Sequence, residues 1–514
     1  MFEQLIETST PIFKLLPETE VGNVEYKLRL DKKNAGKLAK MPSQMVRRAN
    51  GGRETSGRKE AIYILGIMDD GSLPPDHENM DRETVNKTLN IFKKMLNRTK
   101  FRIVETEEKI VDDHLLYALR IATEGNNNKV INETGVIFYG PTGSGKTTLV
   151  SLLAYEQNDN GKGYSRRLSL KHEHEFENGI TSDVKRSFIG FKNDLLMNYS
   201  CCDGNIEDIY MESDRYLTLD DMPGKKKYMR TTLFGILSSK CNIIVNCISA
   251  DTLFDMNENL VEYHSIPYKI AHYKKCKVIT LITKSDLYSP EKLTEGLKNL
   301  VRMLDNISLD NIMKVSSVTG DNVDSLISLL SGLSTTNYMG QKSTNGKDYK
   351  LFMTGETFNT PMTRNVLYGH MKYGNIRIGE ELHVVTAGTL VKCTIKTIQK
   401  KAISADVIFQ GETGCLQIKI SGSLRDVGKS SMLISDDGIK IIENDSITLK
   451  CNQKSKIKEK NYLMICGSTV DTVSLKYKDK KLIISGIDKK LYVLPNSVVA
   501  LKDETGKVII CISE

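Results

Sequence analysis

The stretch GPTGSGKTT, residues 140–148, determines the fold of the central part of this chain. It follows the apolar run VIFY and opens the helical sequence KTTLVSLLAY, so it joins a predicted strand to a predicted helix. Residues 140–147 match the P-loop pattern G-x-x-x-x-G-K-[ST], whose glycines let backbone N–H groups surround phosphate oxygens. A chance Gly-rich turn would not require this strand and helix, and we therefore predict a nucleotide phosphate site. Its predicted members are Gly140, Pro141, Thr142, Gly143, Ser144, Gly145, Lys146, Thr147 and Thr148.

Two side chains of this loop have predicted roles. Lys146 can reach the outer phosphates, and the Thr147 hydroxyl can hold Mg²⁺. The N-terminus of the following helix adds its partial positive charge. The loop leaves the identity of the base open, because the same pattern is common among ATPases.

A second motif, DDMPG, ends another apolar run at residues 220–224. The position of Asp221 suits a carboxylate that lies near Mg²⁺, and the position of Gly224 suits a backbone N–H that donates to the γ-phosphate. The motif therefore predicts the second half of the phosphate and metal site.

Two later motifs favour guanine over adenine. TKSD (283–286) follows the apolar run VITLI, and VSSVTGDNV (315–323) follows a hydrophobic helix. Asp286 can accept hydrogen bonds from guanine N1 and N2, which adenine cannot donate, while the stem of Lys284 lies along the base. Backbone amides of VSSV can donate to guanine O6. The residues assigned to the base are Thr283, Lys284, Asp286, Ser316, Ser317 and Val318.

The apolar pattern divides the chain into four parts. Residues 1–133 mix strands and helices, while 134–335 alternate short apolar runs with helices, as in a mostly parallel sheet covered on both faces. Residues 346–436 and 437–514 have short strands and frequent glycine, which predicts two β-barrels. We therefore predict an α/β P-loop GTPase domain, preceded by an α+β region and followed by two β-barrel domains.

Two local predictions can be tested directly against the structure. The run SPEKLTEGLKNLVRML (289–304) predicts a helix that Ser289 caps, with Pro290 in its first turn. The run LIISGIDKKLYVLP (482–495) predicts a hairpin.

The composition is that of an ordinary globular protein, with 514 residues, 39% hydrophobic, 26% charged and a net charge of +8. No apolar run approaches ~20 residues, so we expect no membrane span. The N-terminus lacks the basic start and apolar core of a secretory signal. The ten cysteines include no C-x-x-C pair, which favours reduced thiols and a cytoplasmic location.

The positive charge is uneven, because residues 27–59 hold eleven Lys and Arg against two acids. Such a cluster either follows RNA phosphates or forms a solvated surface, and both interpretations stay open. Glycine and serine at 50–57 predict a mobile loop in this segment.

The order of these segments resembles a translational GTPase of the elongation factor Tu and elongation factor 1-alpha superfamily. The runs GHMKYGNIRIGEELHVV and GETGCLQIKI are similar to the second-domain barrel of those factors. The runs LPETEVGNVEYKLRL, GRKEAIYILGIMDDGSL, KHEHEFENGITSDV and YMRTTLFGI resemble the GTP-binding protein 1/2 branch, which has an extra N-terminal region. The resemblance covers nearly the whole chain and is weaker after residue 437.

The resemblance implies a GTPase that binds GTP and GDP with Mg²⁺. It implies tRNA or another RNA and the ribosome as partners, and a cytoplasmic monomer without a membrane. It also implies a switch I threonine at Thr181, which completes the Mg²⁺ shell when GTP is bound. The alternating HEHE at 172–175 invites a metal interpretation, but the branch has histidines here with no metal implied.

Two positions depart from the family. Lys225 stands where the family usually keeps a histidine that orients the attacking water, and Gly143 stands where it keeps an aspartate. A protonated lysine cannot accept a hydrogen bond from water. With Lys225 and Gly224 as the predicted catalytic positions, we expect slow GTP hydrolysis. Two alternatives stay open, namely a GTP-dependent RNA- or protein-binding module without useful catalysis, and an ATPase, against which TKSD argues.

Overall fold

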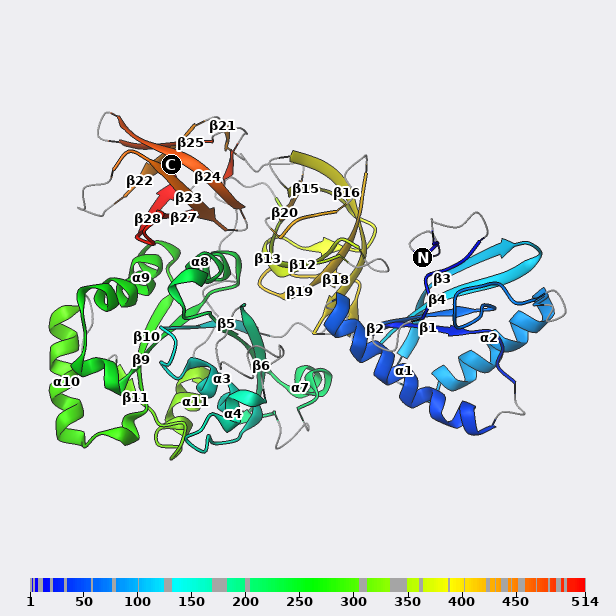
Figure 1. Ribbon diagram of the computed structural model, residues 1–514, viewed down its shortest axis with the longest axis horizontal. Coiled ribbons are helices and arrows are strands. Elements are labelled where there is room, and N and C mark those ends of the chain that lie inside the picture. The colour runs from blue at the N-terminus through cyan, green and yellow to red at the C-terminus, as the bar shows by residue number, and fades with distance from the viewer. Residues whose placement is uncertain are drawn as a thin grey trace.

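The structure is a computed structural model of the chain (Figure 1). It describes residues 2, 5–7, 13–18, 22–31, 35–56, 59–75, 80–99, 101–123, 132–168, 183–198, 204–304, 312–332, 349–359, 364–386, 389–401, 403–421, 426–429, 431–435, 442–444, 446–451, 458–467, 469–478, 481–486, 491–493 and 497–513. Within these ranges, no helix is both long enough and apolar enough to cross a membrane.

The N-terminal region is a small sheet covered on both faces. Its elements are β1 (Val24–Lys27), α1 (Ala35–Ser56), β2 (Glu60–Leu65), α2 (Arg82–Leu96), β3 (Phe101–Val111) and β4 (His114–Thr123). Strand β1 runs parallel to β2, and β4 lies antiparallel between β2 and β3. Alternate residues of β2 face opposite sides, so Tyr63 packs under α1 and α2 while Ile62 packs with Phe2 and Leu15.

The central domain is a seven-stranded sheet in the order β11-β10-β9-β5-β8-β6-β7, parallel except at β6 and β7. Helices α3 and α11 cover one face, and α8 and α9 cover the other. The elements are β5 (Asn132–Tyr139), α3 (Lys146–Tyr155), α4 (Tyr164–Arg167), β6 (Lys185–Lys192), β7 (Leu195–Leu196), α7 (Ile206–Glu212), β8 (Arg215–Asp221), η2 (Lys226–Tyr228), α8 (Met229–Ser238), β9 (Ile243–Ser249), η3 (Ala250–Phe254), α9 (Glu258–Lys274), β10 (Lys277–Thr283), η4 (Ser285–Leu287), α10 (Pro290–Met303), β11 (Ile312–Lys314) and α11 (Val323–Gly332).

Most of the remaining strands form two barrels. Strands β16, β15, β20, β12, β13 and β19 close into a ring through the pairing of β16 with β19, and we call this ring barrel 2. Strands β22, β25, β24, β23, β27 and β28 form the second closed barrel, barrel 3. The elements are β12 (Leu351–Phe358), β13 (Val366–Tyr373), β14 (Ile376–Arg377), β15 (Glu381–Thr386), β16 (Thr389–Lys400), β17 (Ile403–Ala405), β18 (Val407–Ile408), β19 (Thr413–Ile420), β20 (Ser431–Ile434), β21 (Ile442–Asn444), β22 (Ser446–Lys450), β23 (Asn461–Cys466), β24 (Thr469–Lys478), β25 (Lys481–Gly486), β26 (Leu491–Val493), β27 (Val498–Lys502) and β28 (Val508–Ser513).

The predicted fold class is confirmed, although two local predictions are wrong. Strand β25 pairs with β24 and β22, while β26 pairs with β21, so the predicted hairpin at 482–495 does not form. The predicted loop at 50–57 is helical up to Ser56, because α1 continues through its glycines. A Cβ at Gly51 would lie 2.5 Å from the carbonyl oxygen of Gly22, so close packing rather than flexibility explains this glycine. The domain boundaries at 133, 335 and 436 stay predictions.

Part of the basic cluster at 27–59 is internal, which neither earlier interpretation anticipated. Arg48 is 3% exposed and pairs with Glu18 and Glu25. Lys59 is also buried and pairs with Glu207 of the central domain. These cations hold the N-terminal region together and attach it to the central domain, so they do not belong to an RNA surface.

The N-terminal region is also joined to barrel 2. Thr123 at the end of β4 pairs in parallel with Ile403 of β17, which continues into the barrel through β16. Buried Arg120 donates to the side-chain oxygen of Gln417 on β19, at 3.3 Å. Figure 1 shows the region lying beside barrel 2.

A buried polar network connects barrel 2 to the central sheet. Its centre is Glu133 on β5, which accepts hydrogen bonds from Thr218 at 2.5 Å, from Lys401 at 2.8 Å and from the Thr413 hydroxyl at 2.7 Å. Lys240 donates to the backbone oxygen of Glu133. The network fixes barrel 2 beside the strand that leads into the P-loop.

Candidate functional site

The P-loop leaves β5 at the C-terminal edge of the sheet. Strand β5 pairs in parallel with β8 and β9, so the segments that follow these strands meet at the same edge. Gly143 and Gly145 have φ angles of 86° and 76°, a left-handed conformation that favours glycine. The loop then enters α3 at Lys146. The structure thus gives residues 140–147 the strand–loop–helix context that the motif predicted.

Two side chains hold carbonyl groups of this loop. The Thr283 hydroxyl donates to the Ser144 oxygen at 2.8 Å, which connects TKSD to the P-loop. The Lys146 ammonium donates to the Pro141 oxygen at 3.0 Å. Burial lowers the pKa of Lys146, while Asp221 opposes that shift. Inside the loop, the buried Ser144 hydroxyl has no hydrogen-bond partner among the described residues.

The DDMPG motif reaches the P-loop from β8. Asp221 is 1% exposed, and it accepts a hydrogen bond from the Thr147 hydroxyl at 2.6 Å. A Cβ at Gly224 would lie 2.5 Å from the Thr142 nitrogen, so the backbones of the two motifs are in close contact. The structure therefore brings together Thr147, Asp221 and Gly224, three of the residues that the sequence assigned to phosphate and metal.

The two motifs assigned to the base also meet. The Ser316 hydroxyl donates to Asp286 at 2.5 Å, and it accepts from the Val318 amide at 3.2 Å. Ser316 is fully buried, whereas Asp286 and Val318 are exposed. Ser317 accepts from the backbone of Asp159 at 2.8 Å, which attaches the loop to the segment after α3. The Asp286 carboxylate is thus held in place at the rim of the site.

Sequence reasoning missed two residues that contact this site. Asp251 pairs with Lys284 at 3.5 Å and accepts from the Tyr288 hydroxyl at 3.2 Å. Its position directly after the strand NIIVNCISA was the available signal, since carboxyl ends of parallel strands gather site residues. Tyr263 on α9 donates to the Gly140 oxygen at 3.2 Å, and no motif marks it.

The remaining predicted residues lie apart from these contacts. Thr181 and the HEHE stretch are outside the described residues. Thr148 is half-buried in α3, where its carbonyl accepts from the Ser165 hydroxyl at 3.3 Å. Lys225 is half-buried and precedes η2 with extended backbone, while Lys226 and Lys227 are exposed.

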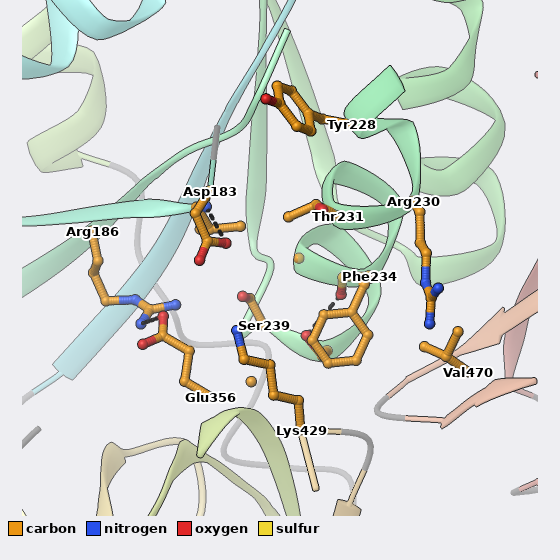
Figure 2. A pocket seen from close by; sticks show the side chains of 14 residues that line it. Asp183, Arg186, Tyr228, Arg230, Thr231, Phe234, Ser239, Glu356, Lys429 and Val470 are labelled. Atoms are coloured by element: carbon orange, nitrogen blue, oxygen red, sulfur yellow. Dashed lines mark hydrogen bonds and ion pairs between the residues drawn. The ribbon is translucent and has the colours of Figure 1, made fainter. Parts of the chain in front are cut away.

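A cavity of about 470 Å³ lies where the central domain meets both barrels, and we call it the interdomain cavity (Figure 2). None of the residues that the sequence assigned to the nucleotide lines it. Arg186 on its wall pairs with Asp220 at 2.7 Å and with Glu356 of barrel 2 at 3.1 Å. The lining comprises Asp183, Val184, Arg186, Tyr228, Arg230, Thr231, Phe234, Gly235, Ser238, Ser239, Gly355, Glu356, Lys429 and Val470.

Comparison with known proteins matches residues 132–336 to the elongation factor Tu GTP binding domain. The chain is 24% identical over 437 residues to GTP-binding protein 2 of Homo sapiens, a match that covers 79% of this chain and 70% of that protein. It is 26% identical over 404 residues to GTP-binding protein 1 of Xenopus laevis, covering 71% of this chain and 58% of that protein.

Among solved structures, the bacterial selenocysteine-specific elongation factor EF-Sec shares the fold with a TM-score of 0.56 and 16% identity. That match covers 75% of this chain and 58% of EF-Sec. The family match coincides with the domain that contains the P-loop, DDMPG, TKSD and VSSV. Residues 132–336 therefore belong to the elongation factor Tu GTP binding domain family, and the chain as a whole is similar to GTP-binding proteins 1 and 2.

Proposed function

We propose that this protein is a translation-factor-like switch that binds GTP with Mg²⁺, contacts tRNA and the ribosome, and hydrolyses GTP slowly. The observation that carries the proposal is the convergence of four motifs at one edge of the sheet. Thr147 contacts Asp221, Thr283 contacts the P-loop, and Ser316 contacts Asp286. This arrangement supports phosphate contacts at one end and guanine contacts at the other.

The residues present fit a magnesium ion. Mg²⁺ prefers oxygen ligands, and the Thr147 hydroxyl and the buried Asp221 carboxylate lie 2.6 Å apart beside the P-loop. These two residues, together with Thr181, would hold the ion. When bound, Mg²⁺ neutralises charge on the phosphate oxygens.

The proposed choice of guanine is tested with Asp286→Asn. The amide that replaces the carboxylate cannot accept from both N1 and N2 of guanine, so we expect GTP affinity to fall and affinity for xanthosine triphosphate to rise. Loss of a hydrogen bond between a charged and a neutral group corresponds to about tenfold or more in affinity. Equilibrium titration with fluorescent analogues of both nucleotides measures the two affinities and therefore the change in preference.

Asp251→Asn is a suitable control for that titration, because Asp251 contacts Lys284 and Tyr288 at the same rim. We expect this variant to keep its preference for GTP. Unchanged GTP affinity in Asp286→Asn would contradict guanine recognition by this residue, and competition by ATP against labelled GTP would favour an ATPase.

We place the proposed RNA contact at the interdomain cavity. Arg230 on α8 and Lys429 of barrel 2 are both exposed there, and the lining also includes the aromatic rings of Tyr228 and Phe234 (Figure 2). Cations that follow phosphates and rings that stack on bases are the usual elements of single-strand recognition. Helix α8 directly follows DDMPG and η2, so an RNA end in the cavity would contact the segment that the nucleotide controls.

Replacement of Arg230 and Lys429 by alanine tests this placement. We expect weaker binding of a tRNA transcript and a salt dependence reduced by about two phosphate contacts, measured by filter binding at several salt concentrations. The matched control replaces the exposed Lys298 and Arg302 of α10, which lie outside the cavity. Equal losses in both double variants would contradict a specific contact at the cavity.

A second candidate is a GTP-dependent binding module without useful catalysis, and Lys225 is the observation that favours it. Multiple-turnover GTP hydrolysis with and without ribosomes separates the two candidates. Stimulation by ribosomes supports a slow GTPase switch, and negligible turnover in both conditions supports the module.

A further inference from the structure

Helix α9 contains a proline, Pro267, in its interior, and this proline leaves one helical carbonyl without its usual backbone donor. Pro267 has no backbone N–H, so the carbonyl of Tyr263, four residues earlier, lacks its helical donor. The hydroxyl of Tyr139 donates to this carbonyl at 3.0 Å. Because Tyr139 is the last residue of β5, the defect in α9 is satisfied by the strand that enters the P-loop.

A second pair of hydrogen bonds fixes the same turn of α9. The side chain of Asn246 donates to the His264 carbonyl at 3.2 Å, and the ring of His264 donates from Nδ1 to the Asn246 oxygen at 2.9 Å. Burial lowers the pKa of His264 to about 4, so the ring is neutral at physiological pH. Asn246 on β9 is the register partner of Tyr139 on β5. The helix is thus attached to the ends of two central strands.

From this fixed turn, the Tyr263 side chain reaches the nucleotide site. Its ring stacks on Tyr139 with centroids 4.8 Å apart and planes at 25°, and its hydroxyl donates to the Gly140 oxygen at 3.2 Å. Gly140 is the first residue of the P-loop and has a φ of 155°. Burial raises the pKa of Tyr263, so its hydroxyl remains a donor.

Helix α9 also packs on barrel 3, through a buried cluster against which Tyr263 itself packs. Ile266 and Ile270 belong to one buried cluster with Val508 and Ile510 of β28. Figure 1 shows α9 below β28, at the boundary between barrel 3 and the central domain. A single helix therefore contacts both barrel 3 and, through Tyr263, the P-loop.

We propose that Tyr263 is a positioning residue of the nucleotide site, which holds the Gly140–Pro141 peptide and couples it through α9 to barrel 3. The inference rests on the proposed binding of a guanine nucleotide at the P-loop. It predicts that the hydroxyl of Tyr263 slows nucleotide release, and that changes in the contact between barrel 3 and α9 alter release through this residue.

Release of N-methylanthraniloyl-GDP from the full chain, followed by stopped flow after addition of excess GDP, tests the proposal. Tyr263→Phe removes only the hydroxyl, and we expect release about fivefold faster, as for loss of one neutral hydrogen bond. Tyr268→Phe is the matched control, since Tyr268 lies on the same helix and its hydroxyl bonds to Thr280 on β10. We expect the control to remain within about twofold of the unaltered chain.

The coupling is tested with Ile510→Ala in both backgrounds. In the unaltered chain we expect faster GDP release, whereas in Tyr263→Phe we expect no further increase, because the connection is already broken. A general loss of stability would instead give independent effects that multiply. Such multiplication overturns the coupling to barrel 3.

Release from Tyr263→Phe within twofold of the unaltered chain, or equal acceleration by Tyr268→Phe, overturns the assignment of Tyr263.

If Tyr263→Phe fails to fold, Pro267→Ala replaces it as the test variant, because a restored N–H competes with Tyr139 for the Tyr263 carbonyl. We expect faster release from that variant, and an unchanged rate overturns the inference. An unaltered chain that does not bind the labelled GDP contradicts the proposed function itself, whereas normal binding with unchanged release contradicts only this inference.

Discussion

At the scale of the residue, Lys225 is the position on which the proposed slow hydrolysis of GTP depends. It directly follows Gly224, whose backbone touches the P-loop, and it is half-buried rather than extended into solvent. An ammonium group can donate to phosphate oxygens but cannot accept a proton or a hydrogen bond from water. We therefore expect Lys225 to slow the proposed hydrolysis of GTP rather than its binding.

We expect Lys225→His to raise the multiple-turnover rate of GTP hydrolysis by about a hundredfold, because a neutral imidazole can accept from the attacking water. GTP affinity should change little, which a titration on the same preparation checks. Lys226→His is the control, since Lys226 is exposed and lies against Gly506 of barrel 3. If the rate of Lys225→His equals that of the unaltered chain, Lys225 is not the reason for slow turnover.

The sequence predicted which segments form the site better than it predicted their individual contacts. The four motifs lie at strand ends as expected, because each consists of a short local pattern. The hydroxyl of Ser316 was not predicted to hold Asp286, since that contact depends on how two loops approach one another. The contact of Tyr263 with Gly140 spans 123 residues and depends on Pro267, so no local pattern reports it.

At the scale of the element, short sequence patterns predicted correctly those elements whose ends are determined by neighbouring residues in the chain. Helix α10 begins at Pro290 as predicted, because the Ser289 side chain accepts from the Lys292 amide and the leucine stripe packs inward. Helix α1 was not predicted, and its C-terminal end was assigned to a loop, because tertiary packing against Gly22 overrides the weak helix propensity of glycine. The predicted hairpin at 482–495 was wrong because β25 pairs with strands of barrel 3, whereas β26 pairs with β21 outside that barrel.

At the scale of the whole molecule, Glu133 joins the central domain to barrel 2. Burial alone would raise the pKa of its carboxyl, but Lys401 and Lys240 outweigh burial and lower that pKa to about 2. Because this folded value lies below the ordinary 4.5, the network contributes its full stability above about pH 4.5. The contribution is lost as the pH falls from 4.5 toward 2.

We expect Lys401→Met to reduce the free energy of unfolding by about 3 kcal/mol at neutral pH, since it leaves a buried carboxylate without its cation. Lys400→Met is a matched control, because the Lys400 side chain is as buried as that of Lys401 but pairs with Glu412 inside barrel 2. Small-angle scattering should show loosening between central domain and barrel 2 for Lys401→Met alone. Identical scattering curves for the two variants would contradict a bridging role for Glu133.

The bond between Arg120 and Gln417 joins residues 297 positions apart, and it has a consequence for synthesis of the chain. The sheet that contains Arg120 is translated early, yet its partner on barrel 2 emerges only after the whole central domain. Until then, the ion-pair partners of Arg120 within the described part of its own region are Glu60 and Glu105. Because long-range contacts form late and slowly, we expect the N-terminal region to fold first as a separate unit and to dock only near the end of translation.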